Sequence, residues 1–287
     1  MKKTAGLLSA LFLLFLVTPL RADVLILAHG YSGNALSWER SGVVSILEAH
    51  GWPRAGMLTV GGPNGIHLAP APGANAANKV YVVNMPSEAP ILVQTQQLEG
   101  MLNLIAQRHP DEDLILAGHS VGGVVARLAL VRSGGPNVKA LITIASPHLG
   151  TPRAEQALDV TDSDGPLDII KEFFGGGTYN YLEYSRPLLV DIIRPRPGTL
   201  LHWLNLQPHP AVTYVSVIRS QSFPLMGDVL VPGYSQDMNN ILPLRGRSRV
   251  IPTATGHSLT PGDGMLLVNV LAHIQAPVEE TTKKDPE

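Results

Sequence analysis

Cysteine is absent from all 287 residues, so neither a disulfide nor a thiolate metal site can contribute to the fold. Charge is also scarce: 15% of the residues are charged, and 21 basic against 23 acidic side chains give a net charge of −2. This balance excludes the composition of a disordered chain and disfavours a nucleic-acid binder, which needs a basic field. Aromatic residues make up 5%, but apolar residues reach 45%. We therefore expect a folded chain with a mainly aliphatic core.

A long apolar run, broken only by small or turn residues such as Gly6, Ser9 and Pro19, lies at the start of the chain. Lys2 and Lys3 precede a largely apolar stretch, and Leu20-Arg21-Ala22 resembles a cleavage site. This arrangement predicts a bacterial-type signal peptide over residues 1–22, since the run is short for a bilayer span. We expect an exported protein, periplasmic or secreted, with no stable membrane span after cleavage. The remaining chain has 18 basic and 23 acidic side chains and must fold without disulfides in an oxidising compartment.

Strand and helix patterns alternate along residues 23–275. Apolar or β-branched runs predict six strands, at 24–28, 80–83, 114–117, 138–145, 212–218 and 250–253. Helical patterns occur at 36–50, around 98–105, at 124–131 and at 265–274. This order predicts an α/β domain: a mostly parallel six-stranded sheet with helices on both faces. Residues 61–77, rich in Gly, Pro, Ala and Asn, predict a long loop, and residues 276–287 a flexible tail.

Residues 151–210 break the alternation, because sixty residues are too many for an ordinary connection between two strands. We expect an inserted cap or lid here. Six of the fifteen aromatic residues of the chain fall between 173 and 203. Of these, Phe173, Phe174 and Trp203 are candidate contacts for an apolar substrate. The alternative is that they only pack the insertion onto the core.

The pentapeptide Gly118-His119-Ser120-Val121-Gly122 is the strongest chemical signal. It follows a predicted strand directly and precedes an apolar helix. A nucleophilic serine needs this strand–turn–helix setting, with glycines on both sides so that the tight turn does not clash with its neighbours. Ser120 is therefore the candidate nucleophile.

Acyl transfer also needs two N–H donors for the developing oxyanion. The amide of Val121, directly after the candidate nucleophile, is one candidate. The amide of Tyr31 is the second, because it follows the first predicted strand between two glycines, Gly30 and Gly33. The alternative for this segment is an ordinary turn at a strand end.

The base and the orienting acid are expected in the order Ser, Asp, His along such a chain. His257 follows the last predicted strand and is the candidate base. Asp228 follows the fifth strand and is the candidate acid, with Asp237 as the alternative. Three further histidines at strand ends are expected to be structural or to line the site: His29, His119 and His148.

These segments resemble the α/β-hydrolase superfamily, and specifically its lipase- and esterase-like members. The resemblance rests on L-A-H-G-Y-S-G, L-A-G-H-S-V-G-G, I-A-S-P-H-L-G-T-P, G-D-V-L-V-P and G-H-S in that order. The I-A-S-P-H-L-G-T-P stretch is similar to bacterial triacylglycerol lipases and to GPI inositol-deacylase-like proteins. The resemblance implies an α/β-hydrolase domain over 23–275 that lacks an N-terminal pair of strands. It also implies Ser120, Asp228 and His257 as the triad, and Tyr31 and Val121 as the oxyanion donors.

The activity implied by this resemblance is hydrolysis of a hydrophobic acyl ester without a cofactor. Calcium-dependent lipases carry an aspartate soon after the catalytic histidine, but Ser258 and Leu259 stand there, so we expect no metal. An acyltransferase or thioesterase would use the same triad and stays open. A non-catalytic binding protein is disfavoured because all three triad residues are present. The sequence leaves the oligomeric state open.

Overall fold

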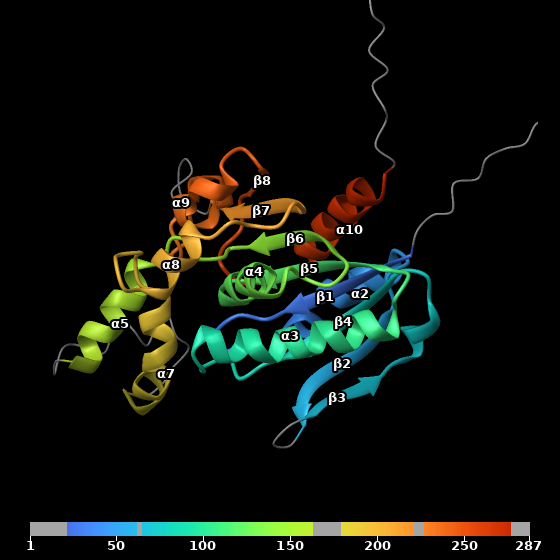
Figure 1. Ribbon diagram of the computed structural model, residues 1–287, viewed down its shortest axis with the longest axis horizontal. Helices are drawn as coiled ribbons and strands as arrows, with labels where there is room; N and C mark the ends of the chain where they lie inside the picture. Colours follow the sequence, from blue (N-terminus) through green and yellow to red (C-terminus); the bar gives the residue numbers. More distant parts are fainter. Residues whose placement is uncertain (1–21, 62–64, 163–178, 221–226, 277–287) are drawn as a thin grey trace, which may run out of the picture.

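A computed structural model describes residues 22–61, 65–162, 179–220 and 227–276. Within these ranges the chain forms one eight-stranded sheet in the order β3-β2-β4-β1-β5-β6-β7-β8 (Figure 1). Every neighbouring pair is parallel except β2 and β3. The strands are β1 (Asp23–Ala28), β2 (Arg54–Gly61), β3 (Gly65–Pro70), β4 (Lys79–Asn84), β5 (Asp113–His119), β6 (Val138–Ile144), β7 (Thr213–Arg219) and β8 (Ser248–Thr253).

The predicted fold class and all six predicted strands are confirmed, but the count of six is wrong. The two extra strands, β2 and β3, form an antiparallel pair at one edge of the sheet. The predicted loop at 61–77 is thus partly strand. Its glycines, prolines and alanines conceal β3, a half-exposed edge strand whose ladder partner is β2.

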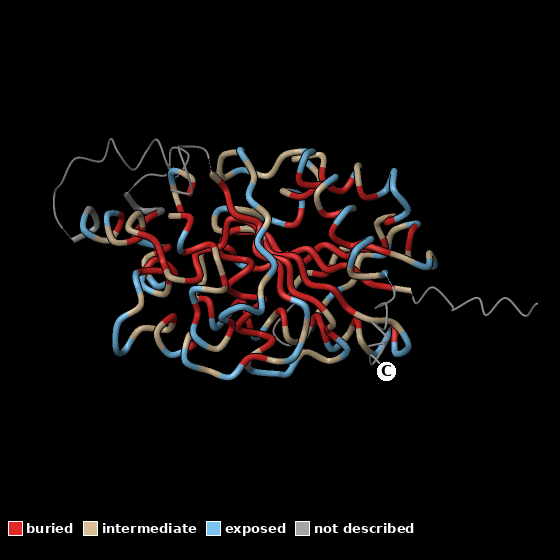
Figure 2. Tube along the Cα trace, turned by 90° about the horizontal axis from the view of Figure 1, so that it is seen from above, coloured by how far each residue is buried: buried red, intermediate tan, exposed pale blue. Residues whose placement is uncertain are grey.

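Helices cover both faces of the sheet, as Figures 1 and 2 show. On β1, Val24 and Ile26 pack toward α3 (Ile91–Arg108) and α4 (Val121–Ser133), whereas Leu25 and Leu27 pack toward the opposite helix layer. That second layer consists of α1 (Ser37–Arg40), α2 (Val43–Ala49) and α10 (Pro261–Gln275). Because the central strands are buried on both faces, they appear in the sequence as continuous apolar runs.

The helix expected over 36–50 is two helices, α1 and α2. Gly42 separates them with φ of +79°, a left-handed conformation that glycine adopts at low cost. Its Cα also lies against Pro261 at the start of α10: a Cβ there would come within 3.1 Å of Pro261 Cγ. The break thus brings α1 and α2 close to the segment that follows β8.

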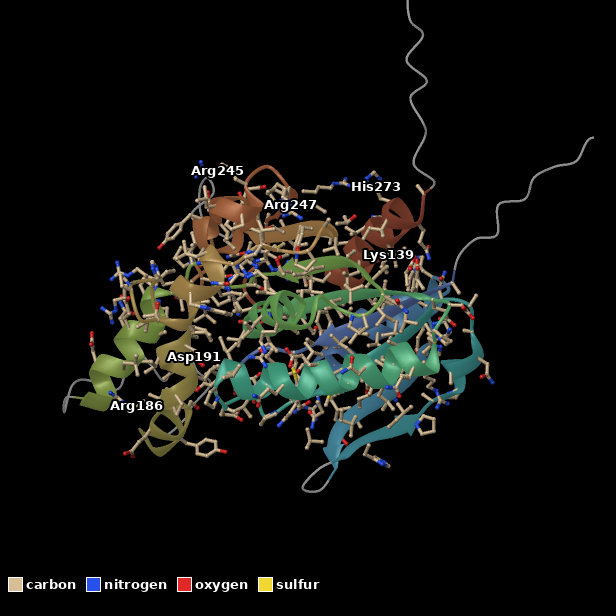
Figure 3. The ribbon with its side chains drawn as sticks, viewed as in Figure 1. Lys139, Arg186, Asp191, Arg245, Arg247 and His273 are labelled. Atoms are coloured by element: carbon tan, nitrogen blue, oxygen red, sulfur yellow. The ribbon has the colours of Figure 1, made fainter. Side chains whose placement is uncertain are left out.

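The insertion between β6 and β7 contains α5 (Pro152–Asp162), α7 (Tyr179–Asp191) and α8 (Leu200–Leu206) among the described residues. Leu188 and Leu189 of α7 are fully buried in the core cluster on the α3–α4 face. At the end of α7, Asp191 lies beside the beginning of α3 (Figure 3) and accepts a 2.8 Å hydrogen bond from the Ile91 amide. The insertion is therefore packed and hydrogen-bonded onto the sheet domain.

The carboxyl ends of the parallel strands all lie along the same side of the sheet, perpendicular to the edge strands. Ligands bind at this side in open α/β folds. The segments after β1, β5, β6, β7 and β8 therefore converge there, and they carry every candidate catalytic residue. No helix in the described part of the chain is long and apolar enough to cross a membrane. Most of the predicted signal peptide, residues 1–21, and the tail beyond 276 lie outside that part.

Candidate active site

Ser120 sits on a strained turn between β5 and α4. Its φ is +52° and ψ −128°, an unfavourable conformation for a residue with a side chain, and its amide donates to the Ile144 carbonyl at 2.8 Å. The flanking glycines are required by space. A Cβ on Gly118 would lie 2.4 Å from the Gly123 Cα, and one on Gly122 would lie 2.3 Å from the His29 carbonyl oxygen. The predicted tight turn is thus present, with its hydroxyl at the carboxyl end of the sheet.

Three of the predicted residues form one hydrogen-bonded chain. The Ser120 Oγ lies 3.0 Å from His257 Nε2, and His257 Nδ1 lies 2.9 Å from Asp228 Oδ2. Since an ionised carboxylate only accepts hydrogen bonds, Nδ1 carries the ring proton and Nε2 is left to accept the Ser120 hydroxyl proton. The residues in this chain are separated by up to 137 positions in the sequence.

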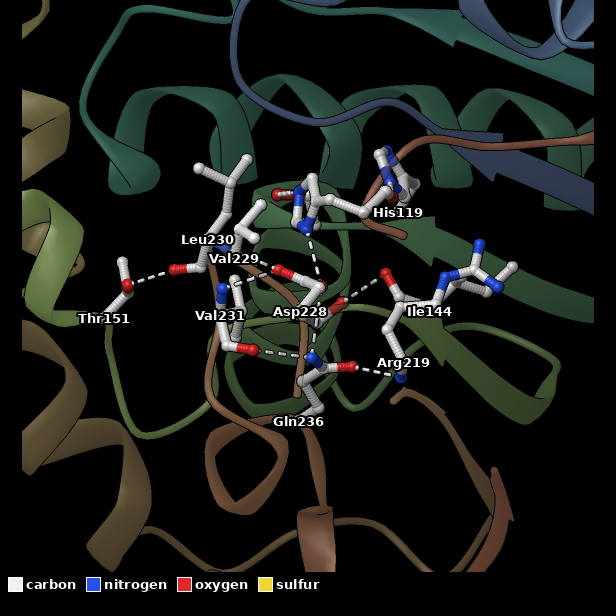
Figure 4. Close-up of polar contacts among 12 residues, drawn as sticks. His119, Ile144, Thr151, Arg219, Asp228, Val229, Leu230, Val231 and Gln236 are labelled. Carbon is white, nitrogen blue, oxygen red and sulfur yellow. Dashed lines mark hydrogen bonds and ion pairs between the residues drawn. The ribbon is translucent and has the colours of Figure 1, made fainter. Parts of the chain in front are cut away.

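Asp228 is held as an ion although its side chain is fully buried. Burial alone would raise its pKa, but the hydrogen bond and charge of His257, with amides of the loop that follows, outweigh this and lower the pKa of Asp228. The amides of Leu230 and Val231 both donate to Oδ1 at 2.7 Å. Figure 4 shows this loop folded around the carboxylate.

Gln236 is a polar partner of the acid that the sequence analysis did not identify. Its Nε2 donates to Asp228 Oδ2 at 3.2 Å and to the Val231 carbonyl at 2.8 Å, while its Oε1 accepts the Arg219 amide at 2.8 Å (Figure 4). Gln236 therefore ties the acid loop to the end of β7. No local motif marks it, because its role depends on contacts over many residues.

The alternative acid has another role. Asp237 Oδ1 accepts the Asn239 amide at 2.8 Å and caps the short 3₁₀ helix at Met238–Asn240. The geometry thus brings Asp228, and not Asp237, to the histidine.

His29 orients the loop that carries the Tyr31 amide. The Met85 amide donates to His29 Nε2 at 3.0 Å, so Nδ1 carries the proton and donates to the Gly30 carbonyl, also at 3.0 Å. Burial lowers the pKa of His29, which keeps the ring neutral for this arrangement. The loop lies directly against Ser120, since a Cβ on Gly30 would be 2.8 Å from Ser120 Cβ. Val121 is the first residue of α4, where the helix itself supplies no acceptor for the amide.

His119 supports the candidate base. Its Nε2 donates to the backbone carbonyl of His257 at 2.8 Å, and the two rings lie 5.1 Å apart. Burial, with the neighbouring His257 charge, lowers the pKa of His119 to about 3. A neutral His119 therefore holds His257 in place without adding a second positive charge.

The buried ion pair between Arg219 and Asp263 holds both ends of the loop that carries His257. The Arg219 guanidinium contacts both carboxylate oxygens of Asp263, at 2.8 and 2.9 Å, and donates to the Thr255 hydroxyl at 2.7 Å. Asp263 in turn accepts the Thr260 amide at 2.8 Å. The loop from 255 to 260 is thus fixed on either side of His257. Neither residue was singled out for this role from the sequence.

A pocket of about 520 Å³ opens onto Ser120 and His257. The insertion contributes Thr151 and Ala154, at its start, and Ile192, just after α7, to the wall of this pocket. Thr151 also donates through its hydroxyl to the Leu230 carbonyl in the acid loop (Figure 4). The insertion therefore contacts both the pocket and the loop that holds Asp228.

The predicted substrate contacts are only partly described. Phe173 and Phe174 lie outside the described residues. Trp203 is on α8, 46% exposed, and it is not among the residues that line the pocket. Apolar lining comes instead from Pro147, Ala154, Ile192, Leu230 and Val231. Within the described ranges, no three His, Asp or Glu side chains are grouped as metal ligands.

Comparison with known proteins agrees with this architecture. A family model for a PGAP1-like alpha/beta domain matches residues 91–162, from α3 through the Ser120 turn to α5. A comparison of the whole sequence with curated proteins finds no match.

Several solved structures share the fold at low sequence identity. The mature form of the lipase BlEst2 from Bacillus licheniformis is 14% identical with a TM-score of 0.61, over 90% of this chain and 94% of that one. The product of gene lin2722 from Listeria innocua is 16% identical with a TM-score of 0.54, over 88% and 91%. A metagenomic carboxyl esterase is 13% identical with a TM-score of 0.52, over 89% and 76%. The sheet order, the strained serine turn and these similarities show that the chain has the α/β-hydrolase fold.

Proposed function

We propose that the protein is a serine carboxylic ester hydrolase, of lipase or esterase type, that acts on a hydrophobic acyl ester. The observation that carries this proposal is the continuous chain from Ser120 Oγ through His257 to Asp228, at 3.0 and 2.9 Å, beside an open pocket. The esterases and lipases of the same fold support it as analogies.

The reaction would proceed through an acyl-serine. Ser120 Oγ attacks the ester carbonyl carbon while His257 Nε2 takes its proton, and Asp228 stabilises the imidazolium that forms. The Tyr31 and Val121 amides stabilise the oxyanion of the tetrahedral intermediate. His257 then passes the proton to the leaving alcohol oxygen as the ester C–O bond breaks. Water, deprotonated by His257, attacks the acyl-serine and releases the carboxylic acid and free Ser120.

The insertion at 151–210 would cap the site and supply the wall for the acyl chain. Ala154 and Ile192 already line the pocket, and Phe173 and Phe174 remain further candidates for the same wall. The leader-like residues 1–22 support export to the periplasm or the medium.

Hydrolysis of 4-nitrophenyl butyrate by the purified protein tests the proposal. Ser120→Ala should lower kcat by at least about a thousandfold, since the triad acts as a unit. Ser133→Ala, which removes an exposed hydroxyl at the opposite end of α4, should keep most of the activity. Turnover by Ser120→Ala at the wild-type rate would overturn the assignment. Partition of the acyl group between water and added alcohols separates a hydrolase from an acyltransferase.

A further inference from the structure

The side chains that line the pocket at Ser120 fall into two chemically different sets. The apolar residues from the insertion and the acid loop form one, as described above. The other contains the polar side chains of the loop after β1, of α1 and of the loop after His257: Ser32, Ser37, Arg40, Ser41 and Ser258. We call this second set the polar wall. A ligand that contacts both sets is therefore apolar in one part and polar in another.

Arg40 gives the polar wall a positive charge. Among the described residues that line the pocket, it is the one side chain with a permanent charge, and no carboxylate joins it there. The adjacent Glu39 is engaged elsewhere, because its Oε1 lies 2.9 Å from Arg54 Nε. The Asp228 carboxylate is fully buried beneath its loop and paired with His257. Within the described part of the chain, nothing near the pocket mouth therefore neutralises the Arg40 guanidinium.

The chemistry of the site determines which end of an ester faces the polar wall. His257 Nε2 must protonate the leaving oxygen, so the alcohol part of the substrate leaves from beside His257. Ser258 and Leu259, the next residues along the chain, line the pocket there. Through the contact of Gly42 with Pro261, α1 and α2 lie close to this loop. The alcohol part thus lies on the side of Arg40, and the acyl part on the side of Ile192.

We propose that the polar wall binds a negatively charged group on the alcohol part of the ester, with Arg40 as its ionic contact. This inference rests on the proposed hydrolase function. A guanidinium suits phosphate or carboxylate oxygens, to which it can donate two parallel hydrogen bonds. The hydroxyl of Ser37 accepts the Asn34 amide at 3.1 Å, so its own proton is available to the same anion. The substrate class is then an apolar acyl ester of an anionic alcohol.

Binding tests the polar wall without turnover. Glycerol 3-phosphate, glycerate and glycerol are titrated calorimetrically into Ser120→Ala at low ionic strength. Comparison of the first two compounds distinguishes a preference for phosphate from a preference for carboxylate. At least one of the two anions should bind about tenfold more tightly than glycerol. Adding Arg40→Glu should remove this difference. Arg249→Glu, the same charge change at an exposed position of β8, should leave it unchanged. Equal binding of all three compounds, or an anion preference that survives Arg40→Glu, would overturn the proposal.

Turnover measurements test the anion subsite and ester hydrolysis separately. With Ser120 intact, kcat/KM is measured for glycerol monobutyrate and for its 3-phosphate, in the wild-type protein and in Arg40→Glu. The value for the 3-phosphate divided by the value for the uncharged ester should fall about tenfold in Arg40→Glu. Turnover with the same ratio in both proteins would overturn the anion subsite and leave ester hydrolysis standing. Selective anion binding without turnover of either ester would overturn ester hydrolysis and leave the subsite standing.

Discussion

At the scale of single residues, the site depends on side chains that hold other side chains. Asp228 orients His257, but its carboxylate is itself held by two loop amides and by Gln236. His119 in turn holds the backbone of His257 through the hydrogen bond to its carbonyl. A loss of any of these contacts should alter the angle or tautomer of the imidazole, and with it the rate of proton transfer.

The choice of acid gives a direct prediction at this scale. Asp228→Asn should lower kcat by several orders of magnitude, because an amide can present an N–H to His257 Nδ1 and favour the wrong tautomer. Asp237→Asn should lower it by less than tenfold, since Asp237 only caps a 3₁₀ helix. Steady-state kinetics of the two variants on one ester checks this. The reverse order of the two effects would make Asp237 the acid.

The residues that the sequence could identify were those with a local pattern. Ser120 has flanking glycines, and Asp228 and His257 follow strands in the expected order. Gln236 and Arg219 have no such pattern. Each acts on a residue that the fold brings close. Gln236 lies eight positions from Asp228, at the end of α9 (Gly233–Gln236), a four-residue helix that is too short to show a periodicity in the sequence. Only the three-dimensional contacts reveal them.

At the scale of secondary-structure elements, the approach of α4 to β1 is what places Ser120. Gly122→Ala would put a methyl group 2.3 Å from the His29 carbonyl oxygen, and backbone on both sides must shift. We expect a loss of about 3 kcal/mol or more in the free energy of unfolding, together with loss of activity. Gly262→Ala on α10 is the matched control, because the nearest atom to its new methyl is the Thr260 hydroxyl at 3.4 Å. Chemical denaturation should find that control as stable as wild type or slightly more so, and equal stability of the two variants would contradict this account.

The insertion helices give a prediction about acyl length. Ile192 lies in the pocket wall just after α7, so Ile192→Ala should reduce kcat/KM for decanoate esters about three- to tenfold more than for butyrate esters. The ratio of the two kcat/KM values within one variant does not depend on the fraction of protein that is folded. Trp203→Ala should change this ratio little, because Trp203 is half-exposed outside the lining. If the ratio changed as much in Trp203→Ala as in Ile192→Ala, the wall that contacts the acyl chain would extend to α8.

The element pattern also shows how far the sequence could predict the fold. Five of the six predicted strands, β1, β4, β5, β6 and β7, are buried on both faces and appear as apolar runs, which made them predictable. The sixth, β8, is a half-exposed strand at the edge of the sheet opposite to β3, and its β-branched residues indicated it. The β2–β3 pair lies at the sheet edge, with half-exposed residues and glycines, so its sequence resembles a loop. Its position became evident only from the ladder with β4.

At the scale of the whole molecule, the first strand of the sheet begins directly after the predicted leader. Asp23 opens β1, is fully buried, and its carboxylate contacts Lys139 Nζ at 2.6 Å and Gln275 at 2.7 Å. Cleavage after Ala22 would therefore leave no spare residue before the sheet. We expect the exported protein to begin at or near Asp23. Intact mass spectrometry of material from the periplasm or medium checks this, and a mass that includes Met1 would contradict it.

In the proposed mechanism, Ser120 is a nucleophile activated by His257 and Asp228 within the α/β-hydrolase fold. Labelling with a fluorophosphonate, followed by peptide mapping, tests this most directly, because the reagent reacts rapidly only with an activated serine. We expect one adduct per chain, on Ser120, and a labelling rate reduced at least about a hundredfold in His257→Ala. An adduct on another residue, or equal labelling rates with and without His257, would contradict it.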